Sequence, residues 1–162
     1  AQVPRGSYSP VVDLSSSADC GGKTLLYLVD GLFTTTQQNI AVSADGKFVT
    51  MDGDYLKSVF VSQDPVAIDS VCYGFLLAER DASLHARDSL LTDTMPPDHT
   101  GENYLHESAL AYNPPSGVVY RDGKGNMVTS LGVHEHWNNP TDKQYSRNLG
   151  KDEGIELVTV TR

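Results

Sequence analysis

The segment 132–140, Gly-Val-His-Glu-His-Trp-Asn-Asn-Pro, gathers more chemically active side chains than any other part of the chain. It contains two imidazoles, a carboxylate, an indole and two amides in six consecutive residues. The largely apolar run 127–133 precedes it and predicts a strand. Because a strand that delivers polar groups into a loop is a common way to build a site, we expect a ligand- or metal-binding site within 134–148.

His134 and His136 are two residues apart, so on a strand they point to the same face and can chelate one ion. Zinc or another transition metal needs a third ligand, for which His106, His99 and Asp98 are candidates. The spacing is not HExxH, which works on a helix. A divalent metal ion is therefore the cofactor that the pattern suggests. The alternative is that both imidazoles hydrogen-bond to the loop and fix its shape.

Trp137 is the only tryptophan, and Asn138 and Asn139 follow it directly. An indole face is apolar and amides give directional hydrogen bonds, so these residues and Tyr145 suggest a platform for a sugar ring. This pattern predicts a non-catalytic carbohydrate-binding module as the alternative to a metal site. A third reading places Trp137 in the core.

Two acidic residues complete the set of candidates. Asp30 closes a predicted strand, where α/β sheets often place site residues. Asp69 lies in an otherwise apolar helix and needs a partner if it is buried, for which Lys143 or Arg147 is available. These two basic residues are also predicted to clamp an anion or a carboxylate. The candidate catalytic residues all bind cations or move protons: Asp30, Asp69, His134 and His136.

The composition excludes several partners. The chain has 162 residues, with 12 basic against 21 acidic side chains and a net charge of -9. Nucleic acids and anionic membrane surfaces need a basic patch, which this balance opposes. No apolar run approaches the ~20 residues that span a bilayer. Cations, small molecules, neutral glycans and proteins are compatible partners.

The chain is long enough for one domain with a real core. Residues 1–7 include Val-Pro-Arg-Gly-Ser, which suggests either an expression-vector remnant or a native lead-in, so the predicted domain is 8–162. Cys20 and Cys72 lack CxxC spacing and are either a disulfide or two free thiols.

Hydrophobic patterns predict the elements that position the site. The runs 23–30 and 56–62 predict strands, the first of them buried and parallel. Asp64 as N-cap and Pro65 at the first position predict a helix over 65–80. A second helix is predicted over 103–112, with a long loop over 81–102 between them.

The C-terminal half shows further strand signals. The runs 118–121 and 127–133 flank a hairpin turn at 122–126, and a last strand is predicted over 155–160. Residues 34–39 predict a loop, 40–42 a short apolar stretch and 45–46 a turn. The order predicts an α/β fold, or a mixed α+β one, with a sheet of about five to six strands and two main helices.

Several motifs resemble the family called domain of unknown function 362. In the first part of the chain they are Val-Asp-Gly-Leu (29–32) and Asp-Pro-Val-Ala-Ile-Asp (64–69). Around the second predicted helix they are Tyr-Leu-His-Glu (104–107) and Asn-Pro-Pro-Ser-Gly (113–117). Near the C-terminus they are Leu-Gly-Val-His-Glu-His-Trp-Asn-Asn-Pro (131–140) and Lys-Gln-Tyr-Ser-Arg-Asn-Leu-Gly (143–150). The last two resemble a branch of secreted bacterial proteins.

The resemblance implies an α/β module whose C-terminal half is this chain, with an N-terminal remainder in the parent protein and a secreted or periplasmic location. Some relatives carry ferredoxin-like cysteine clusters, which this chain lacks. If the resemblance holds, the chain either carries a site of its own or is the structural half of a site that the N-terminal remainder completes.

Overall fold

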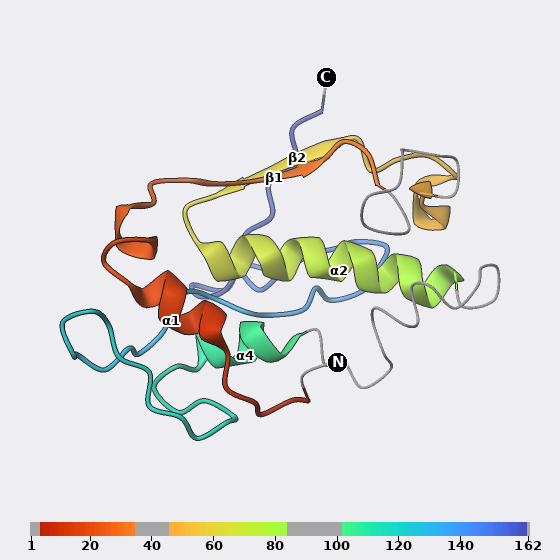
Figure 1. Cartoon of the computed structure of the whole chain (residues 1–162). Helices are drawn as coiled ribbons and strands as arrows, with labels where there is room; N and C mark the ends of the chain where they lie inside the picture. Colours follow the sequence, from red (N-terminus) through yellow and green to blue (C-terminus); the bar gives the residue numbers. More distant parts are fainter. Residues whose placement is uncertain (1–3, 35–45, 84–101, 162) are drawn as a thin grey trace.

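The computed structural model describes residues 4–34, 46–83 and 102–161 (Figure 1). The described elements, in chain order, are α1 (Pro10–Ser16), a short 3-10 turn (Gly21–Lys23), β1 (Tyr27–Gly31), a second 3-10 turn (Val49–Met51), β2 (Ser58–Ser62), α2 (Pro65–Ser83) and α4 (Asn103–Ala109).

Helix α2 runs through the middle of the molecule, between the sheet on one side and the shorter helices α1 and α4 on the other (Figure 1). The segments after α4 wrap around these helices and lie beside α2 on the way to the C-terminus. No helix in the described ranges is both long and apolar enough to cross a membrane. The fold is mixed α+β, built on one long helix.

The sheet has two antiparallel strands, with Tyr27 opposite Ser62 and Gly31 opposite Ser58. The expected parallel, fully buried first strand is therefore wrong. One face of the sheet lies on α2, whereas Leu28, Val59 and Val61 on the other face are exposed. A continuous apolar run indicates burial on both faces, but here only one face is covered.

The expected sheet of five to six strands is also wrong. Residues 118–121 and 127–133 form only an isolated bridge between Arg121 and Met127, around the predicted turn. Beyond it, Thr129 and Leu131 bond to the backbone near α4 instead of to a strand. In 155–160, the backbone N–H groups of Ile155 and Leu157 donate to side chains. Because these backbone groups find other partners, they do not need a sheet ladder.

The two predicted helices, unlike the predicted strands of the C-terminal half, are present in the structure. The helix expected over 65–80 is confirmed as α2, which continues to Ser83. The second helix is confirmed as α4, but it stops at Ala109, before the predicted end at 112, and Leu110 N–H caps it on the His106 carbonyl. Helix α1 was not predicted, and Pro10 occupies its first turn, where a missing N–H costs nothing.

The expectations for 35–45 and for 84–101, including the ligand candidates Asp98 and His99, lie outside the described residues. Both cysteines are free thiols, so the disulfide is not formed. Cys20 is exposed, and burial raises the pKa of the Cys72 thiol to about 12. A thiol with so high a pKa is a poor nucleophile at neutral pH.

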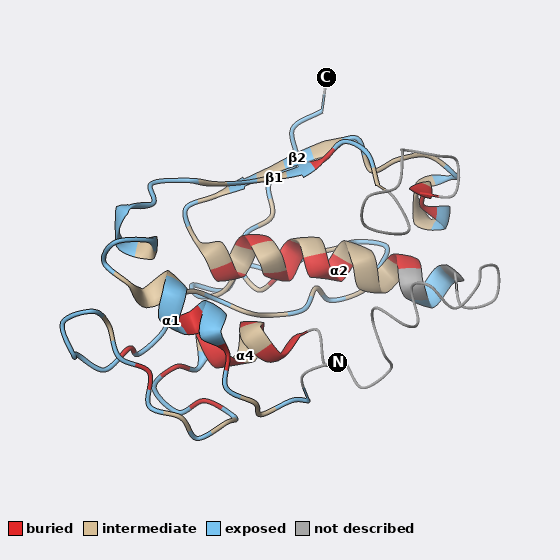
Figure 2. Ribbon diagram, viewed as in Figure 1, coloured by how far each residue is buried: buried red, intermediate tan, exposed pale blue. Residues whose placement is uncertain are grey.

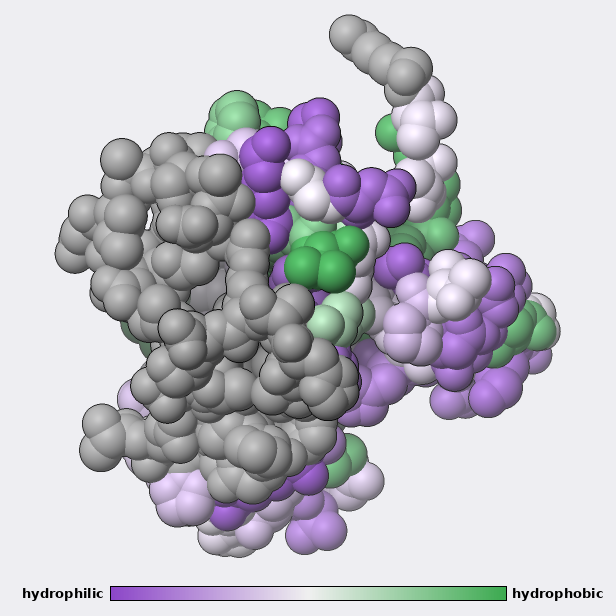
Figure 3. Space-filling view, turned by 90° about the vertical axis from the view of Figure 1, so that its right-hand side faces the viewer, coloured by the Kyte–Doolittle hydropathy of each residue, from purple (hydrophilic) through white to green (hydrophobic). Residues whose placement is uncertain are grey.

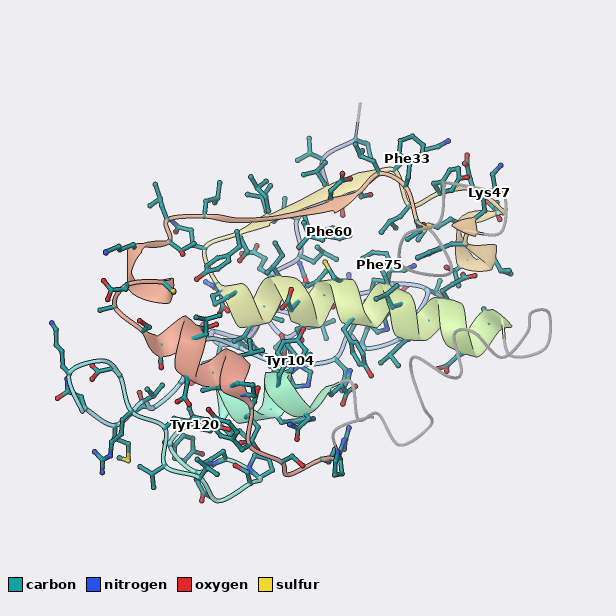
Figure 4. The ribbon with its side chains drawn as sticks, in the orientation of Figure 1. Phe33, Lys47, Phe60, Phe75, Tyr104 and Tyr120 are labelled. Atoms are coloured by element: carbon teal, nitrogen blue, oxygen red, sulfur yellow. The ribbon has the colours of Figure 1, made fainter. Side chains whose placement is uncertain are left out.

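Three apolar clusters form the core, and two of them include residues of α2. Buried and half-buried residues alternate along α2, and exposed residues come only near its C-terminal end (Figure 2). Phe60 of β2 and Phe75 of α2 face each other between sheet and helix, with ring centroids 5.6 Å apart (Figure 4). Tyr104 of α4 lies on the opposite side of α2, while Tyr120 closes the cluster beneath α1. The core therefore fixes α4 against α2.

Asp64 connects the start of α2 to the histidine segment. Its Oδ1 accepts hydrogen bonds from Val66 and Ala67 N–H at 2.8 Å, which confirms the predicted N-cap. Its Oδ2 accepts from Val133 N–H at 2.9 Å. Gly132 permits this contact, since a Cβ there would lie 1.9 Å from Asp64 Oδ1. One carboxylate thus places His134 against the helix.

Asp64→Ala is expected to lower the free energy of unfolding by about 2–3 kcal/mol, because it removes both the helix cap and a charged hydrogen bond to Val133. Urea unfolding followed by Trp137 fluorescence measures the change. The exposed Asp152→Ala is the matched control, with a change below about 0.5 kcal/mol. Equal stability of the two variants would contradict the anchoring role of Asp64.

Candidate functional site

Glu102, His106 and His134 form a group that offers one ligand atom each, all within 4.8 Å of one another. Glu102 is the N-cap residue of α4, and His106 lies one helical turn later. His134 comes from the extended segment that Asp64 anchors. Two elements far apart in the sequence therefore supply the group.

His136 lies at the edge of this group. Its Nε2 is 3.6 Å from Glu102 Oε1, and its side chain is 56% exposed. The ring centroids of His134 and His136 are 5.2 Å apart, and those of His106 and His134 are 4.6 Å apart. Three imidazoles therefore meet around one carboxylate, with His136 on the solvent side.

Ser70 of α2 fixes the orientation of the His134 ring. Its Oγ donates to the Glu135 carbonyl at 3.0 Å and lies 2.7 Å from His134 Nδ1. Since the hydroxyl hydrogen is used on the carbonyl, Nδ1 carries the proton and donates to Ser70. This tautomer leaves the Nε2 of His134 with an unshared lone pair and no proton.

That Nε2 atom is buried and has no hydrogen-bond partner among the described residues. A buried acceptor without a partner is costly, and such atoms in a native fold call for an explanation. Metal-ligating histidines usually donate their other ring N–H to an oxygen, as His134 does to Ser70. The ring is thus held in the state that a metal ligand needs.

The pKa of His134 is lowered to about 4. Burial of the ring is the largest cause, and the neighbouring His106 and His136 add to it. The negative charge of Glu102 acts in the opposite direction but does not overcome burial. His134 is therefore neutral at physiological pH, and a metal does not have to compete with a proton for it.

Glu102 is completely buried and is balanced by positive and polar neighbours. Its Oε2 forms an ion pair with the Arg5 guanidinium at 2.5 Å and lies 3.4 Å from His106 Nε2. The sequence analysis missed Glu102 because it placed this residue at the end of the predicted loop 81–102, one position before the predicted helix. A carboxylate and an imidazole four residues apart at the start of a helix lie on the same face. That spacing is the signal that identifies the pair.

Of the metal ligands expected from the sequence, the structure brings His134 together with His106, one of the proposed third ligands. His136 borders the group but is not part of it. Glu135 points elsewhere, because its Oε1 accepts hydrogen bonds from Ser146 and Ile155 N–H.

The two acidic catalytic candidates are occupied elsewhere. Asp30 Oδ1 accepts a hydrogen bond from Leu32 N–H at the end of β1. Asp69 is bonded to the Tyr104 hydroxyl at 3.0 Å, so the expected pairing with Lys143 or Arg147 is wrong. Burial raises the pKa of Asp69, and the Tyr104 hydrogen bond partly offsets this.

The amides proposed for ligand binding shape their own loop. Asn138 Oδ1 accepts from Asn139 and Gln144 N–H, and Asn139 Oδ1 accepts from Thr141 and Asp142 N–H. These are side-chain turns of the kind that asparagine commonly makes.

The aromatic and basic candidates lie nearby. Trp137 is half-buried, edge-on to Phe75 and under the Lys143 ammonium. Tyr145 is 1% exposed, in the same cluster as Trp137, and Arg147 is exposed.

No protein-family model matches this sequence, and neither the curated proteins nor the solved structures contain a match. The resemblance to the domain of unknown function 362 family therefore stays a prediction. The chemistry of the site has to be argued from its own geometry.

In the metal-free protein, the His134 ring is expected to titrate with a midpoint near 4, well below its ordinary value of 6.5. Because the folded-state pKa is lowered, the neutral ring contributes stability that is complete above pH 6.5 and is lost as the pH falls toward 4. Histidine ring C–H shifts in NMR measure the midpoint. A midpoint near 6.5 would show that the ring is solvated and the pocket open.

Proposed function

We propose that this chain binds one divalent transition-metal ion through Glu102, His106 and His134 and uses it as a Lewis acid. Zinc is the ion that we favour. The observation that carries the proposal is the buried Nε2 of His134, which has no hydrogen-bond partner in the described ranges. It carries no proton in the tautomer whose Nδ1 donates to Ser70. The His134 ring lies with a carboxylate oxygen and a second imidazole in one group of possible metal ligands.

The donor set supports an ion of this kind. Two histidines and one glutamate are the ligands of several catalytic zinc sites, in which a fourth position stays open for water or substrate. Tetrahedral zinc places its ligand atoms about 3.3 Å apart, so the present group needs side-chain movements of about an ångström to close on an ion.

The same donors occur in iron(II) enzymes, where the metal keeps several open positions. Here Arg5 and His136 lie beside Glu102 and crowd the remaining directions. One open position is therefore more compatible with the geometry, which favours zinc. A metal ion in this place would activate a bound water or polarise a substrate oxygen.

A carbohydrate platform on Trp137 has less support. The indole is half-buried between Gly74, Phe75 and Lys143, and the amides of Asn138 and Asn139 are used within the loop. The metal site is therefore the function that the described residues favour. A secreted or periplasmic location stays a prediction from the resemblance.

Protein stripped with a chelator and then dialysed against zinc is expected to hold one equivalent, measured by inductively coupled plasma mass spectrometry. Glu102→Gln and His134→Ala each remove a ligand and should weaken zinc binding by more than about 100-fold, the upper effect of losing an outer-shell partner. Glu156→Gln, an exposed carboxylate, is the matched control and should keep one equivalent.

Near-UV circular dichroism of Trp137 separates loss of a ligand from loss of the fold. A folded wild-type chain without zinc, cobalt or iron(II) above background after reconstitution would refute the proposal.

Ser70→Ala is expected to leave the stoichiometry at one metal per chain and to weaken affinity by about 10–100-fold, because the His134 ring loses the partner that fixes its tautomer. Competition with a chromophoric chelator measures the affinity. Ser130→Ala, on the exposed surface, is the control. An unchanged affinity would mean that Ser70 supports only the fold.

A further inference from the structure

Arg5 brings a second cation to the proposed metal site. One guanidinium nitrogen bonds to Glu102 Oε2 at 2.5 Å, and the side chain is 50% exposed. Among the described residues, the guanidinium has no other hydrogen-bond acceptor. Since arginine carries five side-chain N–H donors, the others are available to a ligand.

The segment that carries Arg5 is firmly attached. Ser7 N–H donates to Asn103 Oδ1, and the Asn103 amide donates back to the Ser7 carbonyl at 2.8 Å. Ser9 N–H donates to the Tyr120 hydroxyl at 3.0 Å. Residues 4–7, expected to be a vector remnant or a native lead-in, are therefore bound to α4. These bonds hold the backbone near Arg5, while its guanidinium reaches Glu102.

With a metal ion bound, the site would carry a net positive charge unless a ligand neutralised it. A divalent ion adds two positive charges, Glu102 offsets one, and Arg5 restores it, which leaves a net charge of about +2. The described residues on the face shown in Figure 3 are mostly hydrophilic, and the chain as a whole is acidic. An isolated positive site on an acidic molecule attracts a small anion and repels a polyanion such as nucleic acid.

Three groups surround the place where that anion would sit: the open metal position, the Arg5 guanidinium and the His136 imidazole near Glu102 Oε1. A carboxylate has only two oxygens, so it has to share one of them between two of these groups. A phosphoryl group has three free oxygens, and the arginine fork matches two of them.

We propose that the site recognises the phosphoryl group of a small phosphate monoester, with Arg5 and His136 completing the binding that the metal begins. This inference rests on the proposed metal site. It assigns to the N-terminal segment a part in ligand binding that the sequence analysis did not give it. Arg5 contacts both the ligand and Glu102, whereas the expected anion clamps Lys143 and Arg147 are not part of the group.

The test uses the full chain, loaded with zinc and titrated with inorganic phosphate by calorimetry. Zinc content is measured first for each variant. Arg5→Ala is expected to keep one zinc and to weaken phosphate binding by about 10–100-fold, the effect of losing a charge-assisted hydrogen-bond pair. Arg5→Lys should restore part of the loss, because it keeps the charge but not the fork. Arg121→Ala, in the exposed turn, is the matched control.

Substitution with cobalt(II) adds a direct readout, since a phosphate bound at the metal has a strongly broadened ³¹P resonance. Acetate is the carboxylate comparator and should bind more weakly than phosphate.

The outcomes separate the two proposals. Equal phosphate affinity of Arg5→Ala and wild type, or acetate binding as tightly as phosphate, overturns this inference and leaves the metal site standing. Loss of zinc from Arg5→Ala shows that Arg5 only positions Glu102, which also overturns it. A wild-type chain that binds no metal removes both proposals.

Discussion

The carboxylate of Asp64 is the constraint on which the site depends. It accepts hydrogen bonds from the first turn of α2 and, with its other oxygen, from Val133. Each of these donors would otherwise be an unsatisfied backbone group at a helix end or in an irregular segment. Because one side chain serves both, the position of His134 is tied to the axis of α2. The same helix then supplies Ser70 to orient the imidazole, so the anchoring and the orienting groups move together.

The local signals in the sequence predict what local interactions decide. Asp64 and Pro65 predict the start of α2, and the histidine spacing points to a segment whose His134 lies beside Glu102 and His106. The sheet was mispredicted because the strand signal of 155–160 reports only apolar pattern, whereas its backbone is satisfied by the side chains of Glu135 and Asn148. Such pairings join residues far apart in the chain and leave no periodic trace. For the same reason, the approach of Glu102 to His134 is a product of tertiary packing.

Glu102 shows how a buried charge organises its surroundings. A carboxylate without solvent is unfavourable unless cations or donors compensate it. Arg5 supplies a full positive charge, and the imidazoles of His106 and His136 lie within 3.6 Å of the Glu102 carboxylate oxygens. Three segments of the chain thus meet at one carboxylate: the N-terminal segment, the start of α4 and the histidine segment. The fold has little sheet, but this convergence provides it with a well-defined polar centre beside one of its apolar clusters.

The uncovered side of the two-stranded sheet has a consequence for the behaviour of the protein in solution. Leu28, Val59 and Val61 project from it in a row that no described element covers. Among the described strands, β1 and β2 pair only with each other, and unpaired strand edges favour association between molecules. The excess of acidic residues keeps the molecules apart at neutral pH through mutual repulsion. As acid protonates the carboxylates, this repulsion disappears while the apolar row stays unchanged. The colloidal stability of the protein is therefore set by charge, and it is lowest in mildly acidic, high-salt solutions.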